Sequence, residues 1–521
     1  MNADYVVVGT GSAGAVLANR LSADPEVQVV VLEAGPRDNN PFVHIPAGFA
    51  QLMQGPRDWN YRTEPQPTLA GRSIYWPRGK MLGGSSSMNA MMWVRGFAAD
   101  YDEWGEYAGD EWDYAHLRPY LQRIEAGPLV ISDQRSPRSS TAAWLTAVQQ
   151  CGYRIDEPNS DEPQGFCETR VNQRRGLRWS TAAAYLKPVR RRKNLTVLTE
   201  ATATRVVFAG NRAIGVEYDG KQGPAVVTAR REVVLCAGAI NSPQLLMLSG
   251  VGDHQQLAAH GIPTVAHSPQ VGANLLDHLV VPLGFDVPGD SLLGAQKPLE
   301  LVNYLLRRRG MLTSNAGEAY GFVKSRPDLA LPDLELIFAP APYFDEAIGD
   351  PYTDHAVVMG PILLKPRSSG TITLRSANPH DKPIIDPRYL SDDADREALL
   401  AGLRICVDIA KAPALRDIVG RIARPLDCTE LNDDTLVKAL ETNSHTLYHP
   451  VGTCRMGSDD ASVVDPQLRV RGVTGLRVAD ASVMPTIIRG HTHAPTVLIG
   501  EKAADLIAAS RPAGLSVVPS H

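Results

Sequence analysis

The 521-residue chain has few cysteines, little excess charge and no long hydrophobic run. Its six cysteines include no C-x-x-C pair and are too sparse for a disulfide framework, so we expect reduced thiols and a cytoplasmic location. The formal net charge of -5, from 52 basic and 57 acidic residues, excludes a strong electrostatic footprint for nucleic acid. No run reaches the ~18 apolar residues of a membrane span, and the apolar run at residues 5–8 begins too early for a signal peptide. We therefore expect neither a transmembrane segment nor export.

The length exceeds what one hydrophobic core supports, so we expect two or more lobes and room for a large cofactor. A hydrophobic fraction of 44% and a charged fraction of 21% are typical of a globular enzyme and exclude a disordered chain. Two short basic stretches, at residues 190–193 and 307–309, are isolated in the sequence. We interpret both as solvated surface.

The N-terminal region contains a glycine-rich turn of the type that binds dinucleotides. An apolar run meets Gly9, Gly11 and Gly14 in G-x-G-x-x-G spacing, and helix-forming residues follow. Glycine lets the backbone turn sharply and approach a pyrophosphate, whose charge then lies at the positive N-terminus of the helix. Glu33 ends a second apolar run, 19 residues after Gly14, where a carboxylate accepts hydrogen bonds from a ribose. We predict a βαβ unit that binds FAD or NAD, two cofactors that this motif does not separate.

Later strand patterns predict an α/β protein, or α+β when the whole chain is considered. Apolar runs at residues 232–237 and 476–480 are predicted to join the first, Rossmann-like sheet. Alternating stretches at residues 333–338 and 370–375 fit an inserted antiparallel sheet flanked by helices. Pro495 before the largely apolar stretch at residues 497–506 predicts a helix with proline in its first turn. The predicted dinucleotide-binding domain is discontinuous and comprises residues 1–155, 196–285 and 445–521. The predicted substrate domain comprises residues 156–195 and 286–444.

Two long segments have glycine, serine and asparagine in a fixed order. Residues 79–89 contain Gly83-Gly84 and three serines before Asn89, and residues 238–252 contain a Ser-Pro-Gln-Leu-Leu run that ends in Ser-Gly-Val-Gly. Both resemble signatures of the glucose-methanol-choline (GMC) oxidoreductases, and the resemblance extends from about residue 4 to about residue 508. In this family the first segment lies against the flavin ring. The resemblance therefore implies FAD as the cofactor and a member similar to choline dehydrogenases or alcohol oxidases.

The resemblance also implies which residues contact FAD. Family positions include the glycine turn, the flavin loop, a backbone contact to adenine at Val206, and Asp480 and Ala481 near the ribityl chain and pyrophosphate. The expected cofactor contacts are Gly9, Gly11, Ser12, Ala13, Gly14, Glu33, Ala34, Gly84, Asn89, Ala90, Val206, Ala237, Tyr448, Asp480, Ala481 and Thr496.

Met88 bears on how the flavin is held. Some relatives have a histidine directly before the loop asparagine, and that histidine binds the flavin covalently. A thioether cannot form this bond. We therefore predict non-covalent FAD.

Two histidines lie in motif segments near the C-terminus. The resemblance implies that His449 is the catalytic base and that His493, 44 residues further on, is its partner beside the flavin N5. Imidazole titrates near neutral pH, which suits removal of a hydroxyl proton while the alcohol carbon gives up hydride. His445 and His491 are expected to support this site, and Glu318 is expected to be solvated or ion-paired.

A metal site built from these histidines is an alternative interpretation. His445 and His449 are four residues apart, with two further histidines in the segment at residues 491–493. However, Pro450 disfavours helical geometry at His449, and the chain has no H-E-x-x-H motif. We expect no metal.

The sequence favours an FAD-dependent dehydrogenase or oxidase that converts a small-molecule alcohol into an aldehyde or ketone, with O₂ or another electron acceptor. The same fold also hosts lyases and decarboxylases without net alcohol oxidation, and this alternative stays open. An NAD-dependent hydride-transfer enzyme is a third possibility. Neither the substrate nor the oligomeric state follows from the sequence.

Overall fold

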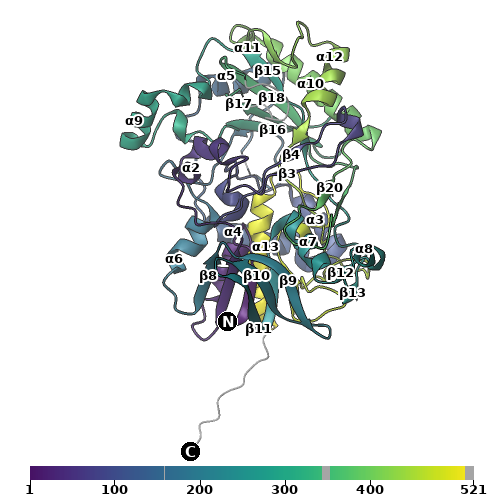
Figure 1. Cartoon of the computed structure of the whole chain (residues 1–521). Helices are drawn as coiled ribbons and strands as arrows, with labels where there is room; N and C mark the ends of the chain where they lie inside the picture. The colour runs from purple at the N-terminus through teal and green to yellow at the C-terminus, as the bar shows by residue number, and fades with distance from the viewer. Residues whose placement is uncertain (158, 343–351, 511–521) are drawn as a thin grey trace, which may run out of the picture.

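Two β-sheets, one in each lobe, organise the chain (Figure 1). The structure is a computed structural model that describes residues 1–157, 159–342 and 352–510. One sheet lies in the lobe that contains the N-terminus, and the other lies at the opposite end of the molecule. The predicted α/β class with an inserted antiparallel lobe is confirmed.

The first sheet has the strand order β8-β2-β1-β11-β10-β9, with β23 also paired to β11. Four parallel pairings join β8 to β2, β2 to β1, β1 to β11 and β11 to β23. The strands are β1 (Asn2–Val8), β2 (Val29–Glu33), β8 (Leu195–Thr199), β9 (Thr202–Ala209), β10 (Arg212–Gly220), β11 (Gly223–Leu235) and β23 (Leu476–Val478). The apolar runs of β1 and β2 are almost wholly buried, as strands covered on both faces require.

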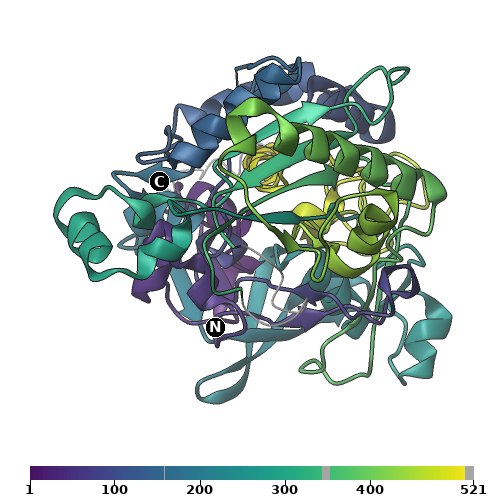
Figure 2. The same ribbon diagram turned by 90° about the horizontal axis from the view of Figure 1, so that it is seen from above.

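The second sheet is antiparallel, with the order β21-β15-β18-β17-β16-β5 and with β14 and β22 attached beside β18. Helices α5 (Ser139–Gln150) and α10 (Asp393–Lys411) pack on it, and Figure 2 shows α10 in green across its outer face. The strands are β5 (Gly165–Glu168), β14 (Leu279–Val280), β15 (Leu283–Asp286), β16 (Ala319–Val323), β17 (Leu334–Ala339), β18 (Ala356–Leu363), β21 (Ile422–Arg424) and β22 (His445–Thr446).

Three of these strands correct the predicted domain limits. β14, β15 and β22 belong to the second sheet, although residues 196–285 and 445–521 were predicted to lie in the first lobe. The stretch at residues 370–375 is also displaced, because β19 (Thr371–Thr373) pairs with β20 (Ile384–Asp386) in a separate ribbon. Strands of two to four residues are too short to show a clear period, so the sequence pattern placed the domain limits a few residues off.

Helices α1 (Gly14–Leu21) and α13 (His493–Ala509) pack against each other, and α13 runs along the middle of the first lobe (Figure 1). The predicted helix after Pro495 is thus confirmed. The other helices are α2 (Pro41–His44), α3 (Ala98–Ala108), α4 (Tyr114–Glu125), α6 (Lys187–Val189), α7 (Gly238–Leu248), α8 (His254–Ala259), α9 (Pro298–Arg307), α11 (Pro413–Arg416) and α12 (Asp433–Asn443). Short ribbons pair β3 (Tyr61–Arg62) with β4 (Tyr75–Trp76), β6 (Gln173–Arg174) with β7 (Leu177–Arg178), and β12 (Val251–Gly252) with β13 (Ala266–His267). Within the described ranges, no helix combines the length and apolar character needed to cross a bilayer.

Candidate active site

A cavity of about 490 Å³ lies between the two sheets. From the first lobe it is lined at the carboxyl ends of β1 and β2, by Val8 and Glu33, which is where open α/β sheets bind ligands. Val280, Ile337 and Val358 line it from the second sheet. Each lobe therefore supplies one wall of a single site.

The glycine turn fits the close approach of a phosphate group. A Cβ added at Gly14 would lie 2.0 Å from the carbonyl oxygen of Gly9, so Gly14 permits the helix to pack against the turn. A Cβ at Gly11 or Gly238 would meet no atom within 4 Å, although both residues line the cavity. The backbone is thus bare on the cavity side, as a bound pyrophosphate requires.

Glu33 is buried and held in place by the turn that it faces. Its Oε2 accepts hydrogen bonds from the Thr10 N–H at 3.0 Å and from Thr10 Oγ1 at 2.5 Å, and its Oε1 accepts one from the Gly35 N–H at 2.9 Å. Burial raises the pKa of Glu33 against these bonds. The carboxyl group therefore fixes the glycine turn and also lines the cavity, where a ribose would lie.

Asp480 follows β23, and its side chain forms hydrogen bonds with the first turns of α7. Its Oδ2 accepts from the Gly238 N–H at 2.8 Å and from Ser242 Oγ at 2.6 Å. A carboxylate near the N-terminus of a helix satisfies donors that have no partner within the helix. Asp480 thus sets the end of α7 that borders the cavity.

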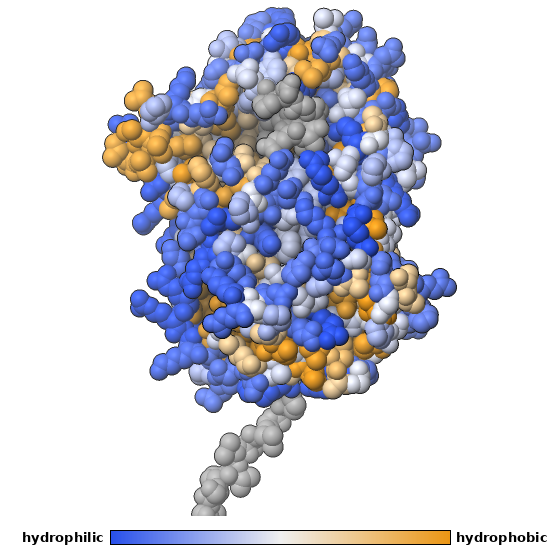
Figure 3. All heavy atoms as spheres, in the orientation of Figure 1, coloured by the Kyte–Doolittle hydropathy of each residue, from blue (hydrophilic) through white to orange (hydrophobic). Residues whose placement is uncertain are grey.

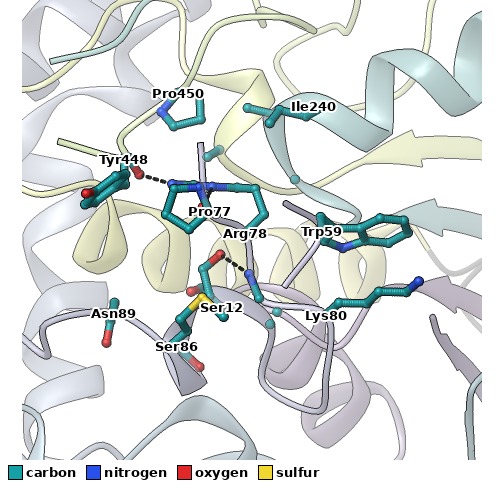
Figure 4. A pocket seen from close by; sticks show the side chains of 18 of the residues that line it. Ser12, Trp59, Pro77, Arg78, Lys80, Ser86, Asn89, Ile240, Tyr448 and Pro450 are labelled. Atoms are coloured by element: carbon teal, nitrogen blue, oxygen red, sulfur yellow. Dashed lines mark hydrogen bonds between the residues drawn. The ribbon is translucent and has the colours of Figure 1, made fainter. Parts of the chain in front are cut away.

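The loop before Asn89 is held by an arginine that sequence reasoning missed. Arg178 is 2% exposed and donates from Nη1 to Asn89 Oδ1 at 2.8 Å, while its Nη2 is buried without a partner in the described part of the chain. Burial lowers the pKa of Arg178 to about 9. Figure 4 shows Asn89 and Ser86 on one side of the cavity and Trp59 and Lys80 on another.

His449 is held in place by contacts with Asp277 and His278, which lie directly before β14 of the second sheet. Its backbone N–H donates to Asp277 Oδ1 at 2.8 Å, and its Nδ1 lies 2.9 Å from Nδ1 of His278. Tyr448 before it has a positive φ of 68°, a conformation held by an N–H bond to Thr446 Oγ1 and by a bond from Arg78 to its carbonyl (Figure 4). The strained residue turns the His449 side chain into the cavity.

The contact with His278 determines the tautomer of His449. Nε2 of His278 lies 3.1 Å from the carbonyl oxygen of Leu364, and a carbonyl only accepts, so Nε2 carries the proton. Burial lowers the pKa of His278 to about 3, so its Nδ1 has a lone pair and accepts the bond from His449. His449 Nδ1 is therefore the donor. The neutral ring then has its lone pair at Nε2.

Burial, followed by the neighbouring rings of His491 and His278, lowers the pKa of His449 well below its usual range. The unprotonated ring with a free Nε2 is the form that a general base needs. Asp277 supports the arrangement, since it also accepts from Thr446 Oγ1 at 2.6 Å and from the Tyr389 hydroxyl. Burial raises the pKa of Asp277 to about 6.

The ring in contact with His449 is that of His491, and His493 lines the same cavity. The centroids of His449 and His491 are 4.8 Å apart. His491 Nε2 lies 3.0 Å from Oε1 of Glu335, a fully buried carboxyl group on β17. His493 Nδ1 lies 2.9 Å from the Ser12 hydroxyl in the glycine turn. Burial, and then the charge of Arg178, lower the pKa of His493 to about 4.

The structure brings most of the expected site residues to one cavity. Those that line it are Gly9, Gly11, Ser12, Ala13, Glu33, Ala34, Gly84, Asn89, Ala90, Ala237, Tyr448, His449, Asp480, Ala481, His493 and Thr496. Gly14 lies behind the turn. His445 and His491 line the cavity too, and the ring of His445 stacks on that of Tyr448 with a centroid distance of 6.2 Å.

Two expected residues, Val206 and Glu318, do not line the cavity. The N–H of Val206 donates to Ser249 Oγ at 2.8 Å in the middle of β9, whereas the cavity is lined by Ala201, Thr202 and Ala203 at the start of that region. The expected backbone contact of Val206 with adenine stays a prediction, and its carbonyl group is the part of that backbone without this bond. Glu318 is fully buried instead of solvated, and it accepts hydrogen bonds from Ser314, Thr141 and the Arg138 N–H.

Asp277, His278, Arg178 and Glu335 were not found by sequence reasoning. The one local signal that could have revealed two of them is an acid and a histidine, Asp277 and His278, directly before a short apolar run at residues 279–281. Among the residues that the structure describes, no group of three or more histidine, cysteine or acidic side chains is arranged to hold a metal ion.

The Rossmann-like sheet and the cavity at its carboxyl edge are those of a dinucleotide-dependent oxidoreductase. Comparison with known proteins gives the family. The GMC oxidoreductase model matches residues 3–280 with its N-terminal part and residues 366–500 with its C-terminal part. The chain belongs to the GMC oxidoreductase family, and it is an FAD-dependent enzyme that acts on CH–OH groups.

Three similar proteins illustrate the range of the family. An uncharacterized GMC-type oxidoreductase of Mycobacterium bovis is 67% identical over 97% of this chain and 99% of its own length. An alcohol dehydrogenase [acceptor] of Pseudomonas putida is 42% identical over 97% of this chain and 95% of its own. The crystal structure of pyridoxine 4-oxidase from Mesorbium loti superposes with a TM-score of 0.88 at 32% identity and covers 98% of this chain and 100% of that chain.

Proposed function

We propose that this enzyme oxidises an alcohol to an aldehyde or ketone, with His449 as the base. The observation that supports this most is the bond from His449 Nδ1 to His278, because it leaves Nε2 of His449 unprotonated at the cavity. FAD, when bound, supplies the acceptor for the hydride that leaves the alcohol carbon. His449 Nε2 takes the hydroxyl proton in the same event, so the proton and the hydride leave one small molecule together.

Two other histidines have positioning roles in this proposal. His491, anchored by Glu335, lies beside His449 and fixes the alcohol oxygen from the other side. His493 holds Ser12 and starts α13, whose positive N-terminal end faces the cavity and favours negative charge there. The expected partnership of His449 and His493 stays a prediction, since both side chains line the same cavity.

We propose that FAD is bound without a covalent bond to the protein. Met88, the residue before the loop asparagine, is 4% exposed and packs with Val43, Leu52 and Met81. A thioether in that place offers no attachment point for the flavin. O₂ or another acceptor then reoxidises the cofactor. A cytoplasmic location stays a prediction, supported by the six unpaired cysteines.

Anaerobic mixing with alcohols tests the reaction. The holoenzyme, titrated with primary, aromatic and amino alcohols in the absence of O₂, is expected to lose its flavin absorbance with at least one of them. Reoxidation with O₂ and with an artificial acceptor dye then separates oxidase from dehydrogenase. If no alcohol bleaches the flavin and carbon–carbon cleavage is observed instead, the protein is a lyase or decarboxylase on this fold.

The lowered pKa of His449 predicts the pH dependence of flavin reduction. A base whose pKa lies below 6.5 remains unprotonated as the pH falls through neutrality, so the reduction rate stays constant there and declines only at lower pH. Stopped-flow reduction at saturating alcohol, between about pH 5 and pH 9, measures this profile. A decline that begins above about pH 7 would contradict the unprotonated state of His449.

A further inference from the structure

Helix α9 presents an apolar face to the outside of the protein. The exposed fractions of its side chains are 81% for Leu299, 79% for Leu306, 58% for Leu305, 50% for Val302 and 46% for Leu301. These five are nearly half of the eleven large hydrophobic side chains that are exposed in the described part of the chain. Figures 1 and 2 show α9 projecting from the body, and Figure 3 shows its tip as a concentrated hydrophobic patch. Such a patch marks an interaction surface.

The inner face of α9 is anchored to the rest of the protein by hydrogen bonds, so the helix is held in a defined position. Tyr304 is 1% exposed and donates from its hydroxyl to the carbonyl of Gly176 at 3.1 Å. The carboxylate of Glu300 accepts from the Met311 N–H at 2.9 Å, which closes the following turn against the helix. The helix thus holds its leucines outward in a fixed arrangement.

Seven cations lie on α9, next to it in the sequence, or on segments that are hydrogen-bonded to it. Lys297 and residues 307–309, all arginine, flank the helix, and Arg135 joins them through a bond from its Nε to the carbonyl of Arg308 at 2.8 Å. The turn that contains Gly176 adds Arg174 and Arg175. None of these seven cations forms an ion pair with a carboxylate among the described residues. The basic stretch at 307–309 is therefore part of a larger cluster and not the isolated surface that its sequence indicated.

We propose that α9 docks on a lipid bilayer that contains anionic phospholipids. A short amphipathic helix with leucines on one side and arginine and lysine around it lies in the interface of a membrane, with the apolar side chains below the headgroups and the cations on the phosphates. At ten residues, α9 is too short to span a bilayer and long enough to lie on it.

The charges decide between a bilayer and a second copy of this chain. In a symmetric dimer the same patch would face itself, so both sets of cations would be brought together and would repel each other. An anionic bilayer offers both partners: its acyl chains accept the apolar side chains of α9, and its headgroups attract the cations near the helix.

The docked face lies close to one wall of the cavity. α9 packs on the 3₁₀ turns η6 (Leu292–Gln296) and η7 (Met311–Thr313), and η7 contacts η1 (Pro46–Leu52). Phe49 of η1 lines the cavity. A bilayer bound at α9 would therefore lie on the side of the molecule where η1 borders the active site.

Vesicle flotation tests the proposal with the full-length holoenzyme. We expect the enzyme to float with vesicles of phosphatidylcholine and phosphatidylglycerol in equal amounts, to float poorly with phosphatidylcholine alone, and to be released by high salt. The double variant Leu299→Gln/Leu306→Gln is expected to lower the bound fraction roughly tenfold or more, with unchanged flavin content and unchanged flavin reduction by a water-soluble alcohol. Val226→Gln, at a side chain that is 44% exposed on β11, is the matched control and should bind like the wild type.

Two results would overturn this inference. The first is a wild-type enzyme that stays unbound with anionic vesicles, or a double variant that binds them equally well. The second is a wild-type dimer in sedimentation without lipid that becomes monomeric in the double variant, because that result assigns the patch to a second copy. Since flavin reduction is measured separately, failure of docking leaves the proposed alcohol oxidation unaffected.

Discussion

Replacement of His449 by alanine is expected to slow reduction of the flavin by alcohol roughly 10²- to 10⁴-fold, because a positioned general base contributes about that factor. The variant should keep its FAD, since the glycine turn and Asp480 lie in the first lobe and do not depend on the imidazole. Anaerobic stopped-flow reduction measures the rate, and the flavin absorbance of the purified variant measures the cofactor content.

Two further variants make this result specific. His116→Ala removes an imidazole whose side chain is 58% exposed on α4 and should reduce at the wild-type rate. His493→Ala should mainly weaken FAD retention, because this ring holds Ser12 of the glycine turn. A His449→Ala enzyme that still reduced its flavin at the wild-type rate would remove His449 from the proposed role.

Alanine at Gly11 is expected to abolish most FAD binding while the protein still folds. The added methyl group meets no atom within 4 Å, so it costs little in the cofactor-free protein, where surface changes away from special features are within about 0.5 kcal/mol. It points into the open space at which a pyrophosphate approaches the backbone. The flavin-to-protein absorbance ratio after gel filtration, together with thermal unfolding of the cofactor-free protein, measures both effects.

Gly14→Ala provides the contrast. A Cβ at Gly14 would lie 2.0 Å from the Gly9 carbonyl oxygen, so this variant should destabilise the cofactor-free fold itself. The two variants separate a steric conflict with the ligand from one within the protein. Full FAD occupancy in Gly11→Ala would show that no phosphate lies against this turn.

Sequence reasoning performed best where the required residues are neighbours along the chain. The glycine turn, its strand and its helix form one continuous segment, and glycine at Gly9, Gly11 and Gly14 meets backbone constraints that are local. The helix after Pro495 was predictable for the same reason. Likewise His449 was identified from the residues beside it, although these said nothing about its contacts.

The partners of His449 could not be predicted because they come from distant strands. His278 follows Asp277 at β14, His491 precedes α13, and Glu335 is one residue of the buried strand β17. The pairing of β14 with β22 and with β18, and of β18 with β17, brings His278 and Glu335 towards His449, and the bond to Glu335 holds His491 there. The contact expected at Val206 depends in a similar way on the register of β9, which decides which backbone groups remain free, and Ser249 takes the N–H.

The base and its proton partner are attached to one lobe, and the glycine turn and α13 belong to the other. Several hydrogen bonds join the two: Arg489, just before α13, donates to the Pro332 carbonyl at 2.9 Å, Lys365 donates to the Ile487 carbonyl at 3.0 Å, and His491 lies 3.0 Å from Glu335. In the proposed reaction, the distance between His449 and the hydride acceptor is therefore set by how rigidly these bonds hold the two lobes together.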